Sequence, residues 1–283
     1  MSDGFRLGVF YTIVRPEEKG ILAAAAERGV AVERLPDSER TFGLEAPDDL
    51  PDVVLIRSVS HTRSLYAARG YTHYGVPTVS SPDVIELAGD KVLASWRLAE
   101  RGIPTPRTVV ALSPEAAMSA IDAIGYPAVL KPAVGSWGRL MARVDDEEDA
   151  VQILEHKAAL PSPVHSVIYV QEYVPKPDRD LRVFVVGDRV VAGMYRYSSE
   201  WRTNAARGGR VTAAPLTPEI TELALRAADA VGGGVLAVDL MESARGLVVH
   251  EVNPTPEFKA LTAATGADVA GAIVEYAVGV GRR

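Results

Sequence analysis

The sequence contains no cysteine, which excludes disulfide bonds, a thiolate nucleophile and cysteine-ligated metal sites. It also has no uninterrupted apolar run near the roughly 20 residues that a membrane-spanning helix needs, so we expect no membrane association. Residues 1–14 are too short and too polar for a signal peptide, which together with the missing cysteine favours the cytoplasm. A net charge of -7 argues against a nucleic-acid partner, because such proteins usually present a basic face.

Lysine is also scarce, since only six of the 30 basic residues are lysine and the rest are arginine. A lysine in a suggestive position is therefore informative. The 283 residues are 47% hydrophobic and 24% charged, which is the composition of an ordinary globular protein. At roughly 100–200 residues per domain, this length predicts two or three domains.

Strands and helices alternate along residues 1–86, and such alternation predicts a parallel sheet covered by helices. We therefore assign residues 1–86 to an N-terminal α/β domain. Residues 87–167 combine helices with short strands in a compact α+β unit. Residues 168–283 are assigned to a third domain, which opens with a strand at 168–172.

Two β-hairpins and a closing helix are predicted for the third domain. The pair Gly187-Asp188 suits the turn of the first hairpin. The second hairpin joins strands at 235–241 and 246–252, and the closing helix covers 269–276. The fold class is thus α/β in the first domain and α+β in the other two.

Three oxygen-bearing side chains stand on the second hairpin, namely Asp239, Glu251 and Asn253. Side chains two apart on a strand point to the same face, so Glu251 and Asn253 project together, and the hairpin can bring Asp239 beside them. Two carboxylates and an amide oxygen suit a hard cation such as Mg²⁺ that also holds phosphate oxygens. The alternative is a set of surface acids at strand ends, although the apolar flanks favour the metal site.

Two lysines and a glycine loop are candidates for binding nucleotide phosphates. Lys131 ends an apolar strand and Lys91 opens a helix, where each can meet a phosphate as a point charge. The loop after Lys131 lets the backbone approach phosphates closely but has neither the Walker nor the Rossmann spacing. It consists of Gly135, Ser136, Trp137, Gly138 and Arg139. The alternatives are two solvated lysines and a simple turn.

Two further segments carry candidate residues. The strand exit at Gln171, Glu172 and Tyr173 exposes backbone groups that can read an adenine edge, with an ordinary strand exit as the alternative. A loop at 196–210 holds four arginines against one glutamate, and fixed cations stabilise phosphoryl transfer. A solvated basic loop is the alternative reading. The five histidines show no metal-ligand spacing, and we assign them structural or surface roles.

Taken together, these segments resemble the ATP-grasp superfamily over nearly the whole chain. The resemblance implies a three-domain ATP-grasp fold with an N-terminal parallel-sheet domain, and ATP bound between the central and C-terminal domains. It rests on Asp90-Lys91, the strand that ends at Lys131-Pro132, the glycine loop, Gln171-Glu172-Tyr173, Asp180-Leu181-Arg182, Arg202-Thr203-Asn204, Asp239 and Glu251-Val252-Asn253.

Within that superfamily the sequence looks closest to the amino-group carrier protein ligases (LysX type). It resembles them in the segments 56–60, 135–139, 155–157, 201–209 and 251–259. The resemblance implies coupling of the side-chain carboxylate of a carrier protein's C-terminal glutamate to the amine of α-aminoadipate or glutamate, in lysine or arginine biosynthesis. It implies a small acidic carrier as partner, an amino-acid substrate and a homo-oligomer. The cofactors would be ATP and Mg²⁺, with two ions expected and Mn²⁺ as a substitute.

The resemblance also implies roles for individual residues. Phosphates would be held by Lys91 and Lys131, with the glycine loop nearby. Adenine would meet Gln171, Glu172 and Tyr173, and the nucleotide side would include Asp180 and Arg182. The transferred phosphoryl group would face Arg196, Arg202 and Asn204, and the metal ligands would be Asp239, Glu251 and Asn253. The substrate side would include Arg57, Ser58 and Thr255.

The role of Arg57 and the function of the protein each leave alternatives open. Arg57 is the candidate for gripping a substrate carboxylate, with an ordinary surface arginine as its alternative. A RimK-type ligase that adds glutamate to another protein or a cofactor is the second hypothesis for function. A nucleotide-binding regulator without catalysis is the third, and the complete set of Asp239, Glu251 and Asn253 argues against it.

Overall fold

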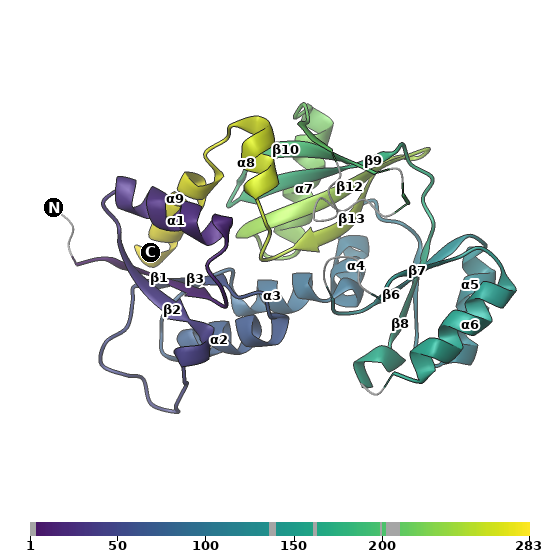
Figure 1. The fold of residues 1–283 in the computed structure, drawn as a ribbon, viewed down its shortest axis with the longest axis horizontal. Coiled ribbons are helices and arrows are strands. Elements are labelled where there is room, and N and C mark those ends of the chain that lie inside the picture. Colours follow the sequence, from purple (N-terminus) through teal and green to yellow (C-terminus); the bar gives the residue numbers. More distant parts are fainter. Residues whose placement is uncertain (1–3, 136–139, 161–162, 199, 202–209) are drawn as a thin grey trace.

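The computed structural model of the protein describes residues 4–283 except 136–139, 161–162, 199 and 202–209. The described strands form one parallel and two antiparallel sheets. Figure 1 shows the N-terminal sheet on the left, the sheet of the C-terminal part at the top centre and the central sheet on the right. Helices α3 (Pro82–Gly89) and α4 (Lys91–Glu100) run between them.

The N-terminal part alternates strands and helices, as predicted. Its elements are β1 (Arg6–Tyr11), α1 (Pro16–Glu27), β2 (Ala31–Pro36), the 3-10 helix η1 (Asp37–Glu39), β3 (Val53–Arg57), α2 (His61–His73) and β4 (Thr78–Val79). The strands pair in parallel in the order β2-β1-β3-β4. Every residue of β3 is buried, because helices cover both faces of such a sheet.

The central part is a four-stranded antiparallel sheet covered by two helices. Its elements are β5 (Thr108–Ala111), α5 (Pro114–Ile124), β6 (Ala128–Pro132), β7 (Ala142–Val144), α6 (Glu147–Ala158), the 3-10 helix η2 (Pro163–Ser166) and β8 (Ile168–Glu172). The strand order is β5-β8-β6-β7. We assigned the strand at 168–172 to the third domain, and this is wrong, because β8 pairs with both β5 and β6. Strand propensity predicted the strand but not its partners.

The C-terminal part is a five-stranded antiparallel sheet with the order β11-β10-β9-β12-β13. Its elements are β9 (Arg179–Val186), β10 (Arg189–Tyr197), β11 (Val211–Ala213), α7 (Pro218–Ala230), β12 (Val235–Ser243), β13 (Gly246–Asn253) and α8 (Lys259–Thr265). Both predicted hairpins are confirmed. Gly187 has a φ of 62° in the turn between β9 and β10, a conformation that glycine adopts without a steric penalty.

The last helix, α9 (Val269–Gly281), joins the N-terminal and C-terminal parts. Its buried residues belong to one apolar cluster that contains Leu7 and Val53 of the parallel sheet together with Phe184 and Ala237 of the antiparallel sheet. The helix was predicted as part of the third domain, yet it packs against α1 and β3. This shared core fixes the N-terminal sheet against the C-terminal one and so fixes the wall that the two present to the site.

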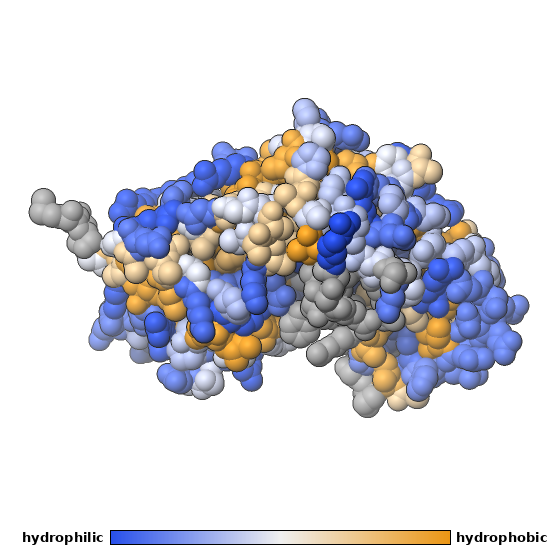
Figure 2. Space-filling model, turned by 45° about the horizontal axis from the view of Figure 1, so that its top comes forward, coloured by the Kyte–Doolittle hydropathy of each residue, from blue (hydrophilic) through white to orange (hydrophobic). Residues whose placement is uncertain are grey.

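The surface does not present one broad apolar face. On the side drawn in Figure 2, apolar residues lie in several separate areas among hydrophilic ones. Among the described residues, no single helix is long and apolar enough to cross a membrane. Helices α8 and α9 meet the length and composition only as a pair, and that pair is bent by 119° at its break.

Candidate functional site

A cavity of about 900 Å³ lies where the three parts meet. This volume is at the upper end of what small-molecule sites usually enclose, so it has room for a nucleotide and a second reactant. The wall combines residues from every part of the fold. They include Arg15 and Ser58 of the N-terminal part, Lys131, Gln171 and Glu172 of the central sheet, and Arg182, Arg196, Asp239 and Glu251 of the C-terminal sheet.

Two carboxylates and an amide gather at the C-terminal sheet, as the hairpin predicted. Asp239 on β12 is paired directly opposite Glu251 on β13, and Asn253 follows two residues later on the same strand. All three line the cavity. Opposite residues of an antiparallel pair and residues two apart share a face, so the register itself brings these groups together.

Asp239 is held by two arginines. Its two carboxylate oxygens accept hydrogen bonds from Nε and Nη2 of Arg182, both at 2.7 Å, and Nη2 of Arg196 lies 3.1 Å away. Arg196 in turn donates two hydrogen bonds to Asp180, at 2.6 and 2.9 Å. Burial alone would raise the pKa of Asp239, but the charges of Arg182 and Arg196 outweigh it and hold that pKa well below its usual range. The carboxylate is therefore ionised at neutral pH.

The donor set fits a hard divalent cation. Carboxylate and amide oxygens are the ligands that Mg²⁺ prefers. The side-chain nitrogen of Asn253 is buried, and the described residues give it no hydrogen-bond partner, so this donor is left for an acceptor that a bound reactant brings. The described residues contain no cluster of three or more His, Cys, Asp or Glu side chains able to hold a metal, so a cation here would also need ligands from a substrate.

The two predicted lysines lie opposite these acids. Asp90 caps α4 by accepting from the amides of Val92 and Leu93, and this places Lys91 at the start of the helix. Its Nζ is 3.1 Å from Glu251 and donates to the carbonyl of Gly135 at 2.7 Å. The positive end of the helix and the acid thus meet across the cavity.

Lys131 is buried, with 3% of its surface exposed. Its Nζ donates to the side-chain oxygen of Gln171 at 2.6 Å. Burial, assisted by the charge of Lys91, lowers the pKa of Lys131 to about 7, and the charge of Glu251 only partly offsets this. Because the Lys131 amine is poorly solvated, it becomes fully protonated when an anion binds beside it.

The strand exit at 171–173 lines the cavity but is braced by arginines. The Glu172 carboxylate accepts from the backbone amide and Nε of Arg107, each at 2.9 Å, and also pairs with Arg245. Burial would raise the pKa of Glu172, but the hydrogen bonds from Arg107 and Arg245 hold it below its usual value. Tyr173 lies against the guanidinium of Arg143, 4.4 Å from the ring centroid. An adenine contact here stays a prediction.

Several predicted residues lie outside the described part of the chain. These are Ser136, Trp137, Gly138 and Arg139 of the glycine loop, and Arg202 and Asn204 of the basic loop. Gly135, at the near end of the glycine loop, is described and receives the hydrogen bond from Lys91.

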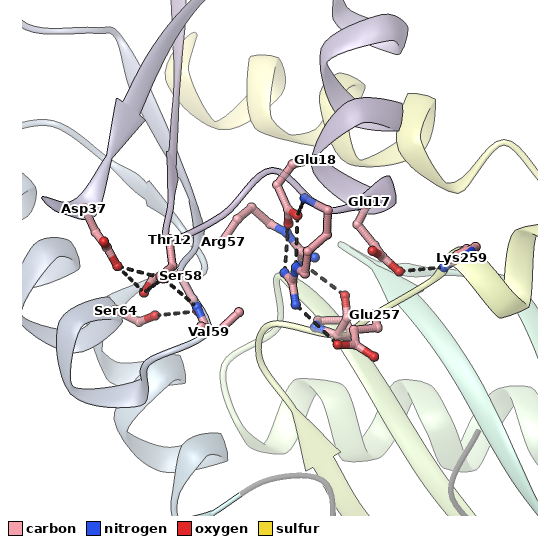
Figure 3. Close-up of polar contacts among 12 residues, drawn as sticks. Thr12, Glu17, Glu18, Asp37, Arg57, Ser58, Val59, Ser64, Glu257 and Lys259 are labelled. Carbon is pink, nitrogen blue, oxygen red and sulfur yellow. Dashed lines mark hydrogen bonds and ion pairs between the residues drawn. The ribbon is translucent and has the colours of Figure 1, made fainter. Parts of the chain in front are cut away.

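Arg57, predicted to grip a substrate carboxylate, does not line the cavity. Its side chain is 1% exposed, and its Nε donates to Glu18 while its Nη1 donates to the carbonyl of Pro256, both at 3.0 Å (Figure 3). The end of β3 points into the packed interface between the first and last parts, which the sequence pattern could not reveal. Ser58 and Thr255 do line the cavity, and the Ser58 hydroxyl donates to Asp37.

Two of the wall residues that the sequence did not single out bear directly on the site. His250 has a structural or surface role in the sequence prediction because the five histidines show no metal-ligand spacing, and regular strand alternation would turn it away from Glu251. A bulge between Asp239 and Leu240 breaks that alternation, and His250 lines the cavity with its Nδ1 3.5 Å from Lys131 Nζ. Burial and the charge of Lys131 hold its pKa well below the usual value. Arg15 is the second, and no motif marked it.

Replacing Glu18 with glutamine is expected to lower the free energy of unfolding by about 3 kcal/mol at pH 7, because both Arg57 and Arg15 lose their anionic partner in a buried setting. Burial raises the pKa of Glu18, but its arginine partners lower it further, so its stabilisation is present above its unfolded pKa of 4.5 and is lost as the pH falls below that value. Urea denaturation at pH 7 and pH 4 measures both effects.

The matched control is Glu275→Gln, which removes an exposed partner of Arg28 and should change stability by less than about 1 kcal/mol. A Glu18→Gln protein as stable as the control would contradict the assignment of Glu18 and Arg57 as a buried bracing pair.

The fold and the cavity together define a nucleotide-dependent ligase of the ATP-grasp class. Residues 88–277 match the RimK-like ATP-grasp domain, and residues 7–87 match the LysX preATP-grasp domain. The chain therefore belongs to the RimK-like ATP-grasp family. It is an ATP-dependent ligase that forms a C–N bond, and ligases of this family use ATP with Mg²⁺.

The likeness to known proteins extends along nearly the whole chain. The protein is 36% identical over 282 residues to the glutamate–LysW ligase ArgX of Sulfolobus acidocaldarius, covering 96% of this chain and 97% of that one. It is 34% identical over 267 residues to the α-aminoadipate–LysW ligase LysX of Sulfurisphaera tokodaii, covering 89% and 91%. The RimK domain ATP-grasp protein of Sphaerobacter thermophilus superposes with a TM-score of 0.80 at 26% identity, covering 96% and 99%.

Proposed function

We propose that the protein couples the side-chain carboxylate of the C-terminal glutamate of a small acidic carrier protein to the amine of α-aminoadipate or glutamate. The reaction would serve lysine or arginine biosynthesis in the cytoplasm. The main support for this proposal is that relatives named as LysW ligases match both the nucleotide-binding part and the N-terminal part over most of their length. Both substrate names occur at similar identity, so the two amino acids stay as alternatives.

The geometry supports an acyl-phosphate mechanism. The carrier carboxylate attacks the γ-phosphate of ATP, ADP leaves, and the neutral amine then attacks the acyl carbon and expels phosphate. Lys91 and Lys131 would hold the phosphates, and Arg196 would face the transferred group from the opposite sheet. Such fixed charges and the orientation of the reactants supply the catalysis, and no covalent enzyme intermediate is needed.

Asp239, Glu251 and Asn253 would hold Mg²⁺, which when bound neutralises triphosphate charge. We propose two ions, with Mn²⁺ able to substitute, and a titration of activity against each metal tests this. Glu172 and Tyr173 would contact adenine, with Asp180 and Arg182 on the same nucleotide side. A homo-oligomer also stays a prediction, and sedimentation velocity tests it.

Intact-mass spectrometry of a small acidic carrier tests the function directly. After incubation with the enzyme, ATP, Mg²⁺ and a panel of amino acids, we expect the carrier to gain the mass of one α-aminoadipate or one glutamate residue with release of ADP. An unchanged carrier beside glutamate addition to a ribosomal protein or a cofactor would favour a RimK-type ligase. No ADP with any acceptor would favour a binding protein without catalysis.

A further inference from the structure

One cation at the N-terminal end of the cavity has no part in the nucleotide chemistry. Arg15 precedes α1, lines the cavity and has 14% of its side chain exposed. Its Nε and Nη2 donate to the two oxygens of Glu18, at 3.0 and 2.8 Å, and its backbone amide donates to Glu18 as well. The guanidinium is therefore fixed in one orientation.

Arg15 shares its buried carboxylate partner with a second arginine. Glu18 is a single carboxylate that pairs with the buried Arg57 (Figure 3). It pairs with Arg15 as well. Arg57 is buried and does not line the cavity, so Arg15 is the guanidinium of this pair that faces it. Two further carboxylates act on Arg15, namely Glu257 at 3.3 Å from Nη1 and the nearby Glu17.

The free edge of Arg15 matches a second carboxylate. A guanidinium carries five N–H donors, and Glu18 occupies the edge formed by Nε and Nη2. The end formed by Nη1 and Nη2 keeps one donor on each nitrogen, which is the fork that binds a carboxylate in a bidentate manner. Glu257 makes only a long contact there, with its own side chain 43% exposed, so an incoming carboxylate can replace it.

The remaining cations of the cavity are less suited to binding a second carboxylate. Lys91 and Lys131 face Glu251 and the phosphate end. Arg182 and Arg196 are committed to Asp239 and Asp180. Lys259 lines the same end as Arg15, but it is exposed and offers a flexible point charge rather than a fixed fork.

We propose that Arg15 binds the second, distal carboxylate of the amino-acid substrate and so selects dicarboxylic amino acids over neutral ones. This assignment rests on the proposed function as an amino-acid ligase. Glu18 and Arg57 are positioning residues, since Glu18 orients Arg15 while Arg57 holds the carbonyl of Pro256 in the facing wall. The wall residues from Thr255 to Glu257 directly follow the candidate metal ligands along the chain, so this end of the wall adjoins them.

The test compares Arg15→Gln, Arg15→Lys and Lys259→Met with the wild type. Ligation onto the carrier gives KM and kcat for glutamate, α-aminoadipate and the neutral norleucine. Equilibrium dialysis of labelled glutamate and α-aminoadipate, with the protein loaded with Mg²⁺ and a non-hydrolysable ATP analogue, gives binding without turnover. Arg28→Gln is the matched control, because Arg28 pairs with carboxylates from the end of the same helix but outside the cavity wall.

We expect Arg15→Gln to raise KM and the dissociation constant for the two dicarboxylic amino acids by about 30- to 100-fold, because a charge-assisted bidentate pair is lost. KM for ATP and the weak use of norleucine should stay within about twofold of the wild type, which a merely unfolded variant could not maintain. Arg15→Lys should recover part of the loss, and Lys259→Met and Arg28→Gln should have effects below about threefold.

Unchanged affinity of Arg15→Gln for both dicarboxylic amino acids would overturn the assignment, as would a larger loss in Lys259→Met. If the wild type ligates neither amino acid onto a carrier, the proposed function fails, yet dialysis still decides the role of Arg15. A wild type that binds neither dicarboxylic amino acid would overturn both.

Discussion

An enzyme carrying Asp239→Asn is expected to lose ligation activity by about a thousandfold or more, because the substitution removes one of two carboxylates available to the cation and unbalances the arginines beside it. Arg182 would then face a neutral amide, and the amide nitrogen cannot accept a hydrogen bond as the second carboxylate oxygen does. The free energy of unfolding should fall by about 3 kcal/mol, since Asp239 is 2% exposed and the unpaired charge stays buried. Steady-state ADP release and urea denaturation measure the two losses.

The chain offers a closely matched control for this substitution. Glu242 lies on the same strand as Asp239 and makes the same kind of two-bond pair, with Arg179 of β9 at 2.7 and 2.8 Å. That pair is about one-third exposed and is separate from the cavity wall. Glu242→Gln should therefore keep wild-type kcat and cost less than about 1 kcal/mol. Equal losses in the two variants would show that Asp239 serves only the sheet.

Replacing Lys131 with methionine is expected to weaken ATP use by about a hundredfold in kcat/KM, because a buried cation beside phosphate oxygens is worth several kcal/mol. The same substitution should make the free protein more stable at pH 7, since methionine fills a similar volume without desolvating a charge. Lys157→Met is the control, because Lys157 is also buried and its pKa is also lowered by burial, but it lies on α6 away from the cavity. A Lys131→Met enzyme with unchanged ATP kinetics would remove Lys131 from the phosphate site.

The pKa of Lys131 gives the wild type a distinctive pH dependence. With a folded pKa of about 7 against 10.5 for the ordinary side chain, the unfolded chain binds one proton more than the folded protein between these values. Stability should therefore rise with pH from about 7 to 10.5, at roughly 1.4 kcal/mol per unit, and this rise should be absent from Lys131→Met. Denaturation at pH 7.5 and pH 9 measures the slope.

ATP binding provides an independent readout of the same group. Triphosphate placed beside Lys131 restores its ordinary pKa, so binding at pH 8.5 should take up close to one proton. Calorimetry in buffers of different ionisation enthalpy measures this uptake, and the Lys131→Met protein should show none of it. Equal uptake by both proteins would place the titrating group elsewhere.

Much of the wall that holds the acids and lysines follows from local sequence patterns. Alternation with a period of two puts Glu251 and Asn253 on one face, and the hairpin adds Asp239 opposite Glu251. The Asp90 cap starts α4 at Lys91, as the helix prediction required. These features depend on residues close along the chain, where strand register and helix capping decide the geometry.

The pairing of distant segments did not follow from the sequence. Strand β8 has the same apolar character whether it joins the central or the C-terminal sheet, and only the hydrogen bonds to β5 and β6 place it. Helix α9 is similar, because its apolar residues require a core but do not say which of the two neighbouring sheets supplies it.

The sequence by itself determined the elements, the second hairpin with its acids, and the positions of Lys91 at a helix start and Lys131 at a strand end, because short-range periodicity and caps set them. The tertiary structure alone decided which further side chains line the cavity. It buried Arg57 behind the wall, turned His250 inward through a bulge and left Arg15 at the surface of the cavity. Arg57 contacts the carbonyl of Pro256, 199 residues away, and Arg15 contacts Glu257, 242 residues away, so no local pattern encodes which arginine faces the cavity.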